Sequence, residues 1–317
     1  MNRQIMETKL SIIILNWNTR DLLKQCLKSI INELSINRME TEVIVIDNGS
    51  FDDSVQEVKN LKLKIENSLK IVNCKLKIVE NEENLGFSKG NNIGIKAASG
   101  QYIMLLNSDT IVKEESIEKL ISYLEKNPNT AVSPMLELPD GKPQMDYYMH
   151  FPNLWQIFLY HNPLIRPLAM STPLKAIFCQ QPKEEPFEVD QLPGAALVAR
   201  RETWEKVGNL DPDFKFLWED VDWSWRARKK GIKLVVVPEA KIIHIGGASW
   251  KKKLGEEKLR FYQQFFASML LFVSKNYNPF SFLAFKTALA TNFLLTFKVQ
   301  LFLSLLKGDF KQEKLWD

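Results

Sequence analysis

The segment IMLLNSDT, residues 103–110, decides how the fold of this chain is predicted. It begins with four apolar residues that suit the interior of a buried strand, and it closes on Asn107, Ser108 and Asp109. A carboxylate at the end of an apolar strand is costly if it stays unpaired away from water. The position of Asp109 therefore predicts a partner, either a bound ligand or the N-terminus of a following helix.

Working outward, the first 140 residues alternate between apolar runs and segments with helical spacing of their apolar residues. Four runs rich in Ile, Val and Leu are predicted to be strands buried on both faces: 10–17, 41–48, 76–81 and 101–108. Helices are predicted between them at 19–34, 53–68 and 88–98, and a further short strand at 132–136. This order favours an α/β fold with a mostly parallel sheet and helices on both faces.

The second half of the chain is less regular. Residues 138–186 are rich in proline and aromatic residues and are predicted to form an irregular or partly helical insertion. Further elements are then predicted: a strand within 189–201, helices at 201–207 and 218–231, two strands separated by a proline turn within 233–247, and helices at 256–275 and 280–307.

Charge and cysteine content limit the class of protein. The 317 residues carry a net charge of +4, of which residues 251–317 supply +6 (11 basic and 5 acidic residues), so the remainder carries 4 − 6 = −2. A basic, apolar tail favours an anionic membrane surface over nucleic acid, although a solvated basic face is the alternative. Three widely spaced cysteines and an N-terminus without a small-residue cleavage site predict a cytoplasmic protein.

Polar residues follow each predicted strand of the first half. The clusters are Asn16–Asn18, Asp47–Gly49, Asn84–Asn92 and Asn107–Asp109. The carboxyl ends of parallel strands lie on one edge of a sheet, where ligands bind in α/β folds. The four clusters therefore predict one binding crevice.

The absence of two common nucleotide-binding motifs limits the class of ligand that this crevice could bind. No GxGxxG follows the first strand and no GxxxxGK[ST] is present, which disfavours dinucleotide and P-loop folds. Asp47 is placed to accept hydrogen bonds from a base or ribose, or to stabilise a turn before Gly49. If the ligand is a nucleotide diphosphate, Asp109 would repel it unless a divalent cation bridges the two.

Seven motifs, in order along the chain, resemble those of the family 2 glycosyltransferases, and most closely the bacterial rhamnosyltransferase-like subgroup. They are IIILNWN, VIVIDNGSFDDS, ENLGFSKGNN, YIMLLNSDT, PGAALVARRETWEKVGNLDPDF, FLWEDVDWSWRARKKG and HIGGAS, and the match runs in order from about residue 10 to residue 249. The resemblance implies a GT-A domain over 1–250. Its nucleotide-binding half would cover about 1–136 and its acceptor half 137–250, followed by a tail of apolar helices at 251–317.

The resemblance also implies a metal site that binds Mn²⁺ or Mg²⁺. Asp109 matches the last residue of the family's Asp-x-Asp motif, and Asn107 stands where the first aspartate would be. His244 matches a histidine that completes the metal site in some members, and otherwise it would be an ordinary core histidine. A single carboxylate predicts modest metal affinity unless the diphosphate supplies further ligands.

Nucleotide-sugar contacts are implied at further positions. Asp47 matches the residue that contacts the base. The other expected positions are Asn16, Asn18, Asn84, Gly86, Lys89, Asn107, Asp109 and Gly194. Lys89 would meet a phosphate or remain solvated, and the small residues Gly194 and Ala195 would let the donor sugar or the acceptor approach the strand closely.

Asp220 matches the catalytic base, with Glu219 beside it. An acceptor hydroxyl must lose its proton as it attacks the anomeric carbon, and a carboxylate within reach can take it. Both acids could instead be first-turn residues favoured by the helix dipole, and Asp222 is expected to pair with Arg226.

Aromatic residues flank these acids. Trp218 is predicted to be a platform for the acceptor sugar, whereas Trp223 and Trp225 are predicted to pack in the core.

The apolar segment 280–307 contains Lys286 and Lys298, and its longest uncharged stretch there, 287–297, is shorter than the ~20 residues that span a bilayer. An interfacial helix is therefore predicted, with burial against the domain or a homo-oligomer as the alternative.

Together these features predict an inverting, metal-dependent transfer of a sugar from a UDP- or dTDP-sugar to a glycan acceptor, perhaps lipid-linked, in cell-surface polysaccharide synthesis at the inner membrane face. The alternatives are a non-catalytic sugar-nucleotide or glycan-binding scaffold and a nucleotidylyltransferase. The latter would need a Gly-rich, basic first loop that residues 16–19 do not supply.

Overall fold

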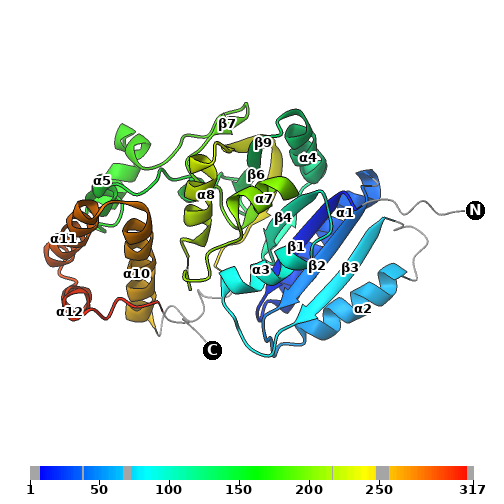
Figure 1. The fold of residues 1–317 in the computed structure, drawn as a ribbon, viewed down its shortest axis with the longest axis horizontal. Coiled ribbons are helices and arrows are strands. Elements are labelled where there is room, and N and C mark those ends of the chain that lie inside the picture. Colours follow the sequence, from blue (N-terminus) through cyan, green and yellow to red (C-terminus); the bar gives the residue numbers. More distant parts are fainter. Residues whose placement is uncertain (1–7, 38, 67–72, 216, 248–256, 313–317) are drawn as a thin grey trace, which may run out of the picture.

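A computed structural model describes residues 8–37, 39–66, 73–215, 217–247 and 257–312 (Figure 1). The strands are β1 (Leu10–Asn16), β2 (Thr41–Asp47), β3 (Cys74–Glu80), β4 (Tyr102–Asn107), β5 (Thr110–Val112), β6 (Thr130–Glu137), β7 (Phe187–Glu188), β8 (Ala196–Arg200) and β9 (Lys233–His244). The predicted boundary at residues 250–251 lies outside the described residues, as do Ala248 and Ser249 of the HIGGAS motif.

The helices alternate with the strands in the first half of the chain and cluster at its end. They are α1 (Arg20–Asn37), α2 (Ser54–Glu66), α3 (Phe87–Ala97), α4 (Ser116–Lys126), α5 (Leu154–Leu159), α6 (Arg166–Met170), α7 (Arg201–Val207), α8 (Glu219–Lys229), α10 (Lys258–Asn276), α11 (Pro279–Leu295) and α12 (Val299–Lys307). Two short 3₁₀ helices, η1 (Met145–Tyr147) and η2 (Pro173–Ile177), lie in the insertion, which is partly helical as predicted.

The strands form one nine-stranded mixed sheet in the order β3-β2-β1-β4-β8-β6-β9-β5, with β7 paired to β9. Strands β3, β2, β1 and β4 are mutually parallel, β6 is parallel to β9, and β8 runs antiparallel between the two groups. The sheet is therefore mostly parallel, and the α/β fold predicted from the sequence is confirmed.

Helices cover both faces of this sheet. The chain moves from β1 through β2 to β3 and then returns to β4 on the other side of β1. Because parallel crossovers are right-handed, this reversal places α3 on the face opposite α1 and α2. Helix α4 contacts α1, while α7 and α8 contact each other on the face of α3 (Figure 1).

Two predictions of strands differ from the structure. The predicted strand at 132–136 is the eight-residue β6, and 233–247 contains one strand, β9, in place of two. In place of the predicted proline turn, β9 contains a bulge. Val237 of β9 pairs with Pro134 of β6, and the next residue of β6, Met135, pairs with Lys241 of β9.

The prediction of one long helix at 280–307 is also wrong. The helix breaks after Leu295, and Phe297 has a positive φ of 53°, so α12 folds back against α11. A second apolar core then forms among α10, α11, α12 and α5, beside the one around the sheet. Packing against neighbours thus overrides the continuous apolar pattern. Over the described part of the chain, every helix is too short or too polar to cross a bilayer.

Candidate active site

A cavity of about 230 Å³ opens beyond the carboxyl ends of β1, β2 and β4; we call it the sheet-edge cavity. The parallel register brings these ends together, since Asn16 is level with Asp47 and Leu15 with Asn107. The lining residues are Leu15, Trp17, Thr19, Asn48, Asn84, Leu85, Gly86, Phe87, Asn107, Ser108, Asp109, Tyr147, Gly194, Ala195, Lys215, Leu217, Glu219, Asp220, His244 and Gly247.

Three potential metal ligands meet at one end of this cavity. Antiparallel pairing of β5 with β9 places His244 opposite Thr110, and hence next to Asp109. The His244 Nε2 atom lies 3.4 Å from Asp109 Oδ1 and 3.4 Å from the Asn107 side-chain amide. Asp109 and His244 are buried and Asn107 is partly buried, so the cluster is largely shielded from bulk water.

Gln144 determines which nitrogen of His244 carries the proton. The Gln144 Nε2 group donates to the His244 carbonyl at 2.5 Å, so its Oε1 atom faces His244 Nδ1 at 2.9 Å as an acceptor. A neutral His244 therefore carries its proton on Nδ1 and presents the Nε2 lone pair to Asp109. Two electron-rich atoms 3.4 Å apart are stabilised by a cation between them.

The donor set fits a divalent metal that shares its shell with a ligand. Asp109 and His244 would supply an oxygen and a nitrogen, and Asn107 would supply a second oxygen after rotation of its amide. No group of three or more His, Cys, Asp or Glu side chains suited to a metal occurs among the described residues. A metal held here would therefore take further ligands from a bound anion.

The two acids of the Glu219–Asp220 pair stand at the start of α8, facing the same cavity. The two preceding residues, Leu217 and Trp218, both have positive φ, at 59° and 74°. Such backbone strain persists where the surrounding structure enforces it, often at functional sites.

Asp220 is fixed by backbone donors. Its Oδ2 atom accepts from Gly194 N at 2.9 Å and its Oδ1 from Val221 N at 2.8 Å. Burial nevertheless raises the pKa of Asp220. A Cβ at position 194 would lie 3.2 Å from the Phe87 ring, which would have to shift by a few tenths of an ångström, and 3.5 Å from the Asp220 Cβ, which is an ordinary contact.

Glu219 is more deeply buried, with 4% of its surface exposed. No hydrogen-bond partner meets its Oε2 atom among the described residues. Burial, and then the charge of Asp220, raise the pKa of Glu219 well above the usual range of a carboxyl. Of the two acids, Asp220 ionises more readily because two backbone N–H groups donate to it, whereas Glu219 keeps its proton to higher pH and can then donate a hydrogen bond to a ligand.

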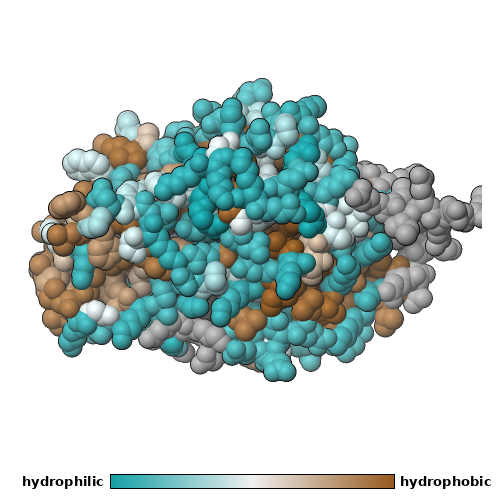
Figure 2. All heavy atoms as spheres, viewed as in Figure 1, coloured by the Kyte–Doolittle hydropathy of each residue, from teal (hydrophilic) through white to brown (hydrophobic). Residues whose placement is uncertain are grey.

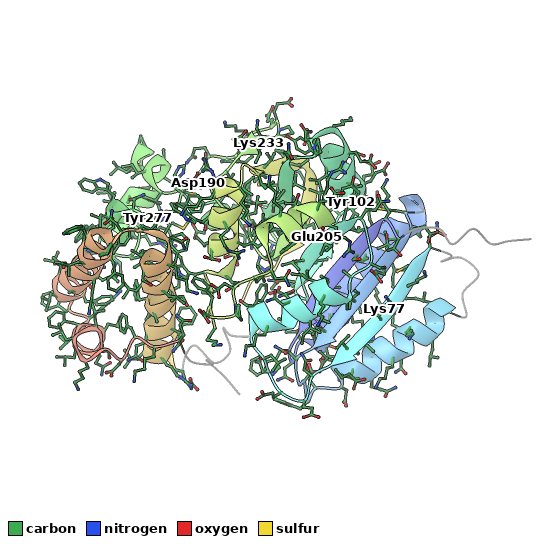
Figure 3. The ribbon with its side chains drawn as sticks, in the orientation of Figure 1. Lys77, Tyr102, Asp190, Glu205, Lys233 and Tyr277 are labelled. Atoms are coloured by element: carbon green, nitrogen blue, oxygen red, sulfur yellow. The ribbon has the colours of Figure 1, made fainter. Side chains whose placement is uncertain are left out.

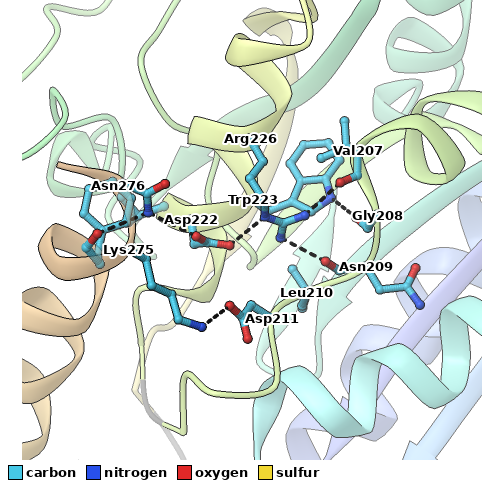
Figure 4. Close-up of polar contacts among 12 residues, drawn as sticks. Val207, Gly208, Asn209, Leu210, Asp211, Asp222, Trp223, Arg226, Lys275 and Asn276 are labelled. Atoms are coloured by element: carbon cyan, nitrogen blue, oxygen red, sulfur yellow. Dashed lines mark hydrogen bonds and ion pairs between the residues drawn. The ribbon is translucent and has the colours of Figure 1, made fainter. Parts of the chain in front are cut away.

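Helix α8 is held in place by polar contacts with the α7–α8 loop (Figure 4). Arg226 donates to Asp222 Oδ2 at 2.7 Å, as predicted, and also to the carbonyls of Val207 and Asn209. The Trp223 indole donates to the Gly208 carbonyl. These contacts determine where the first turn of α8, and so Asp220, lies.

Helix α10 contributes on the other side of α8. Asn276 donates to Asp222, and Lys275 pairs with Asp211 (Figure 4). The neighbouring Tyr277 donates to the Pro152 carbonyl of the insertion, and Figure 3 shows its place at the end of α10.

A second cavity, of about 510 Å³, lies between the insertion and the C-terminal helices; we call it the aromatic cavity. It shares Tyr147, Leu217 and Asp220 with the sheet-edge cavity. Burial, together with the charges of Asp109 and Asp220, raises the pKa of Tyr147, so its phenol stays protonated. Asp220 thus stands where the two cavities meet.

The predicted site residues divide into two groups. Most of them line the sheet-edge cavity: Asn84, Gly86, Asn107, Asp109, Gly194, Ala195, Glu219, Asp220 and His244. The cavity lining does not include Asn16, Asn18, Asp47 or Lys89. Asp47 accepts from Asn16 Nδ2 and from Ser50 N, both at 2.9 Å. Asn18 accepts from Phe51 N, and Lys89 is exposed. Their roles remain predictions.

Trp218 lines the aromatic cavity, not the sheet-edge cavity. It is 9% exposed and packs edge-on against Phe265 of α10, with ring centroids 5.8 Å apart. Trp223 is buried as predicted, and Trp225 is partly buried against Tyr277.

Sequence analysis missed Gln144, Tyr147 and Lys215. The first two lie in the irregular insertion, where no periodic pattern marks a functional residue. Lys215 follows the quoted LDPDF motif and lines the cavity, with its backbone carbonyl near Gly86 and its ammonium donating to the Pro212 carbonyl. Only a search of the sequence for a positive charge to match the expected anion would have found Lys215.

Comparison with known proteins gives consistent results. Over 167 residues the chain is 30% identical to an uncharacterized glycosyltransferase of Haemophilus influenzae, covering 52% of this chain and 48% of the relative. Over 254 residues it is 29% identical to the poly-beta-1,6-N-acetyl-D-glucosamine synthase of Staphylococcus epidermidis, covering 77% and 53%. The chain thus spans about half the length of these curated relatives.

A solved structure shares the fold. The crystal structure of GalNAc-T7 with UDP, GalNAc and Mn²⁺ superposes with a TM-score of 0.58 at 21% identity, covering 83% of this chain and 51% of that one. Residues 11–179, just over half of the chain, match the family model described as Glycosyl transferase family 2. With its central α/β sheet of the GT-A type, the chain belongs to glycosyl transferase family 2.

Proposed function

We propose that the chain is an inverting, metal-dependent glycosyltransferase. It would move a sugar from a UDP- or dTDP-sugar to a glycan acceptor in the synthesis of a cell-surface polysaccharide. The observation that carries this proposal is the place of Asp220 at the junction of two cavities. One cavity holds the Asp109–His244 pair suited to a diphosphate-bound cation, and the other is lined by aromatic side chains suited to sugar rings.

The geometry supports a single displacement. Asp220 would accept the proton of an acceptor hydroxyl that enters from the aromatic cavity. The acceptor oxygen forms a bond to the anomeric carbon while the bond from that carbon to the diphosphate oxygen breaks, and the diphosphate leaves with that electron pair. Attack opposite the leaving group inverts the anomeric configuration without a covalent enzyme intermediate.

The residues around the diphosphate would stabilise its growing charge. When bound, a divalent metal supplies positive charge to the leaving group. Asp109 and His244 would hold that metal, and Lys215 also lines the cavity. The buried, protonated Glu219 would donate a hydrogen bond to the bound sugar.

Two other functions remain as alternatives, and one feature argues against each. A non-catalytic scaffold has no use for a strained turn that aims an acid into a cavity junction. A nucleotidylyltransferase needs basic residues in its first loop, whereas Asn16 and Asn18 make hydrogen bonds within the loops that follow β1 and β2.

The same proposal includes a cytoplasmic enzyme that contacts the inner face of a membrane through its C-terminal helices. Brown, apolar side chains cover the end of the molecule where α11 and α12 lie (Figure 2). Phe280, Phe297 and Leu306 are exposed there, and Lys286 and Lys307 belong to the same helices. Contact between two copies of the chain is the alternative use of this face.

Asp220→Asn tests the function. We expect nucleotide-diphosphate binding to stay near wild type while turnover falls by ~10²–10⁴, the usual contribution of a general base. The measurements are calorimetric binding of UDP with Mn²⁺ and release of nucleotide from a panel of nucleotide sugars with acceptor. Asp21→Asn, which alters an exposed first-turn acid of α1, is the matched control. Unchanged turnover in Asp220→Asn would remove Asp220 from this role.

A further inference from the structure

Tyr147 lines the sheet-edge cavity close to the expected metal ligands, and no step of the proposed reaction uses it. It ends the short η1 helix, and its ring packs edge-on against the His244 ring with centroids 5.1 Å apart. A Cβ added at Gly246 would lie 3.6 Å from the Tyr147 hydroxyl oxygen and 3.6 Å from His244 Cε1. The phenol therefore stands on the side of the cavity that holds the Asp109–His244 pair.

The hydroxyl of Tyr147 differs from that of the next residue, Tyr148, in its hydrogen bonds. The buried Tyr148 hydroxyl donates to the Pro134 carbonyl at 2.7 Å and accepts from Leu136 N at 2.8 Å. The Tyr147 hydroxyl makes no hydrogen bond to any of the described residues, although its side chain is only partly exposed. Tyr148 thus stabilises the fold, whereas the Tyr147 hydroxyl can donate to a ligand.

Several other donors of the sheet-edge cavity are already engaged within the protein. Lys215 is the single Lys or Arg among the described lining residues, and its ammonium donates to the Pro212 carbonyl at 2.9 Å. Asn48 Nδ2 donates to Asn84 Oδ1 at 2.8 Å. A leaving diphosphate needs donors because negative charge grows on its oxygens. Tyr147 can supply one without giving up a contact that the folded chain uses.

We propose that Tyr147 is a further catalytic residue, whose hydroxyl donates a hydrogen bond to the diphosphate of the nucleotide sugar as that group leaves. This assignment rests on the proposed function. The phenol keeps its proton throughout: the diphosphate leaves with the electron pair of the broken bond, and the proton of the acceptor goes to Asp220. The hydrogen bond strengthens as the leaving oxygens gain charge, so it favours the transition state over the bound donor.

Tyr147→Phe removes the hydroxyl and keeps the ring against His244. The melting temperature should stay near that of the wild type, because the hydroxyl makes no hydrogen bond within the described part of the folded chain. Turnover with the nucleotide sugar that the wild type uses should fall roughly 10²-fold, the loss typical of removing one donor to a developing negative charge. Hydrolysis of that nucleotide sugar without an acceptor should fall as much, because it releases the same diphosphate.

Calorimetry with Mn²⁺ locates the phosphate on which the hydroxyl acts. The ligands are UDP and dTDP, together with UMP and dTMP, which lack the terminal phosphate. In Tyr147→Phe the affinity for the diphosphate should fall about tenfold or more, the usual loss when a hydrogen bond to a charged group is removed. The affinity for the monophosphate should stay near that of the wild type.

Two further tyrosine variants serve as controls. Tyr123→Phe removes a hydroxyl from α4, outside both cavities, and should leave turnover and nucleotide binding unchanged. Tyr148→Phe removes two hydrogen bonds of the fold, so it should lower the melting temperature and keep the wild-type ratio of diphosphate to monophosphate affinity. A loss confined to the diphosphate therefore belongs to the Tyr147 hydroxyl and not to a weakened fold.

Two results in Tyr147→Phe would overturn the assignment. Diphosphate and monophosphate binding that weaken equally would mean that Tyr147 only shapes the cavity. Diphosphate binding like that of the wild type would mean that the hydroxyl does not meet the leaving group, whatever happens to turnover. A wild-type protein that binds neither UDP nor dTDP with Mn²⁺ would instead defeat the proposed function itself.

Discussion

At the residue scale, the site depends on how polar groups are held at the end of a buried strand. Asp109 and His244 come from segments 135 residues apart, yet their oxygen and nitrogen atoms lie 3.4 Å apart because β5 pairs with β9. Gln144 fixes the tautomer of His244 through two contacts. It touches no ligand in this arrangement, so we regard it as a positioning residue.

Gln144→Leu should weaken metal-dependent nucleotide binding. Without its acceptor, the His244 ring is free to rotate and to move its proton to Nε2, and loss of such a supporting contact costs roughly 10–100-fold in metal affinity. The measurement is the Mn²⁺ dependence of UDP binding, with EDTA as the zero-metal reference. Gln101→Leu, which lies outside the cavity linings, serves as control. A Mn²⁺ titration identical to wild type would show that Gln144 does not orient the histidine.

Glu219→Gln should change how stability depends on pH. The pKa of Glu219 is raised in the folded state above its ordinary value of 4.5, so the folded protein binds more protons than the unfolded chain over that interval. Stability from this group is present below pH 4.5 and is lost as pH rises toward the raised pKa. The amide variant has no such loss.

The melting temperature of Glu219→Gln minus that of the wild type should therefore increase as pH rises from 4.5 to about 8. Glu202→Gln, an exposed first-turn acid of α7, should run parallel to the wild type. A constant difference between Glu219→Gln and the wild type across this range would mean that Glu219 ionises normally.

At the element scale, α8 illustrates how a short helix is placed by its neighbours. Its sequence predicts the helix and its Gly231 terminus, and the structure agrees to within one or two residues. Its position in the fold does not follow from its own sequence, because it depends on contacts with distant segments. Arg226 of α8 donates to the Val207 carbonyl at the end of α7, and Asn276 of α10 donates to Asp222 of α8 (Figure 4). The catalytic geometry we propose depends on those contacts.

Arg226→Met should destabilise the protein by about 2–3 kcal/mol, because it leaves the buried Asp222 carboxylate without its cation while Arg226 itself is partly exposed. It should also lower turnover by displacing Asp220. Urea unfolding and steady-state turnover measure the two effects. Lys229→Met, an exposed position on the same helix, should change neither substantially. Wild-type stability in Arg226→Met would mean that α8 is placed by apolar packing alone.

At the scale of the whole molecule, many of the exposed apolar side chains gather at the end that α11 and α12 form. The end formed by α11 and α12 exposes aromatic and aliphatic side chains, and Figure 2 shows brown side chains there and in smaller patches elsewhere on this face. Monomeric soluble proteins rarely expose large contiguous apolar patches. Basic residues near such a surface suit an anionic bilayer.

The double variant Phe280→Glu/Leu306→Glu should lose binding to vesicles containing phosphatidylglycerol, as measured by flotation. The two side chains are 86% and 63% exposed, and each buried apolar side chain contributes about 1.5–3 kcal/mol. Phe51→Glu, at a position 83% exposed in the loop between β2 and α2, should float like the wild type. A wild type that does not float, but whose dimer dissociates in the double variant, would assign this face to self-association.

The sequence by itself determined the strands and helices of the first half and the polar clusters at the strand ends. Those features depend on local periodicity and on residues that adjoin a strand in the chain, which a single sequence displays directly. It also indicated Asp109, because an acid at the end of an apolar strand is locally conspicuous, whereas Asp220 and His244 were implied by the family resemblance. The family resemblance joined these residues into one site.

Only the tertiary structure decided which distant side chains complete that site. Gln144, Tyr147 and Lys215 lie in irregular segments whose conformation follows from packing against β9, α8 and α3, not from their own sequence. The break at Phe297 has the same cause, since folding α12 back buries apolar surface that a straight helix would leave in water. Local pattern specifies elements, whereas the place of Asp220 in the lining of two cavities depends on how those elements pack.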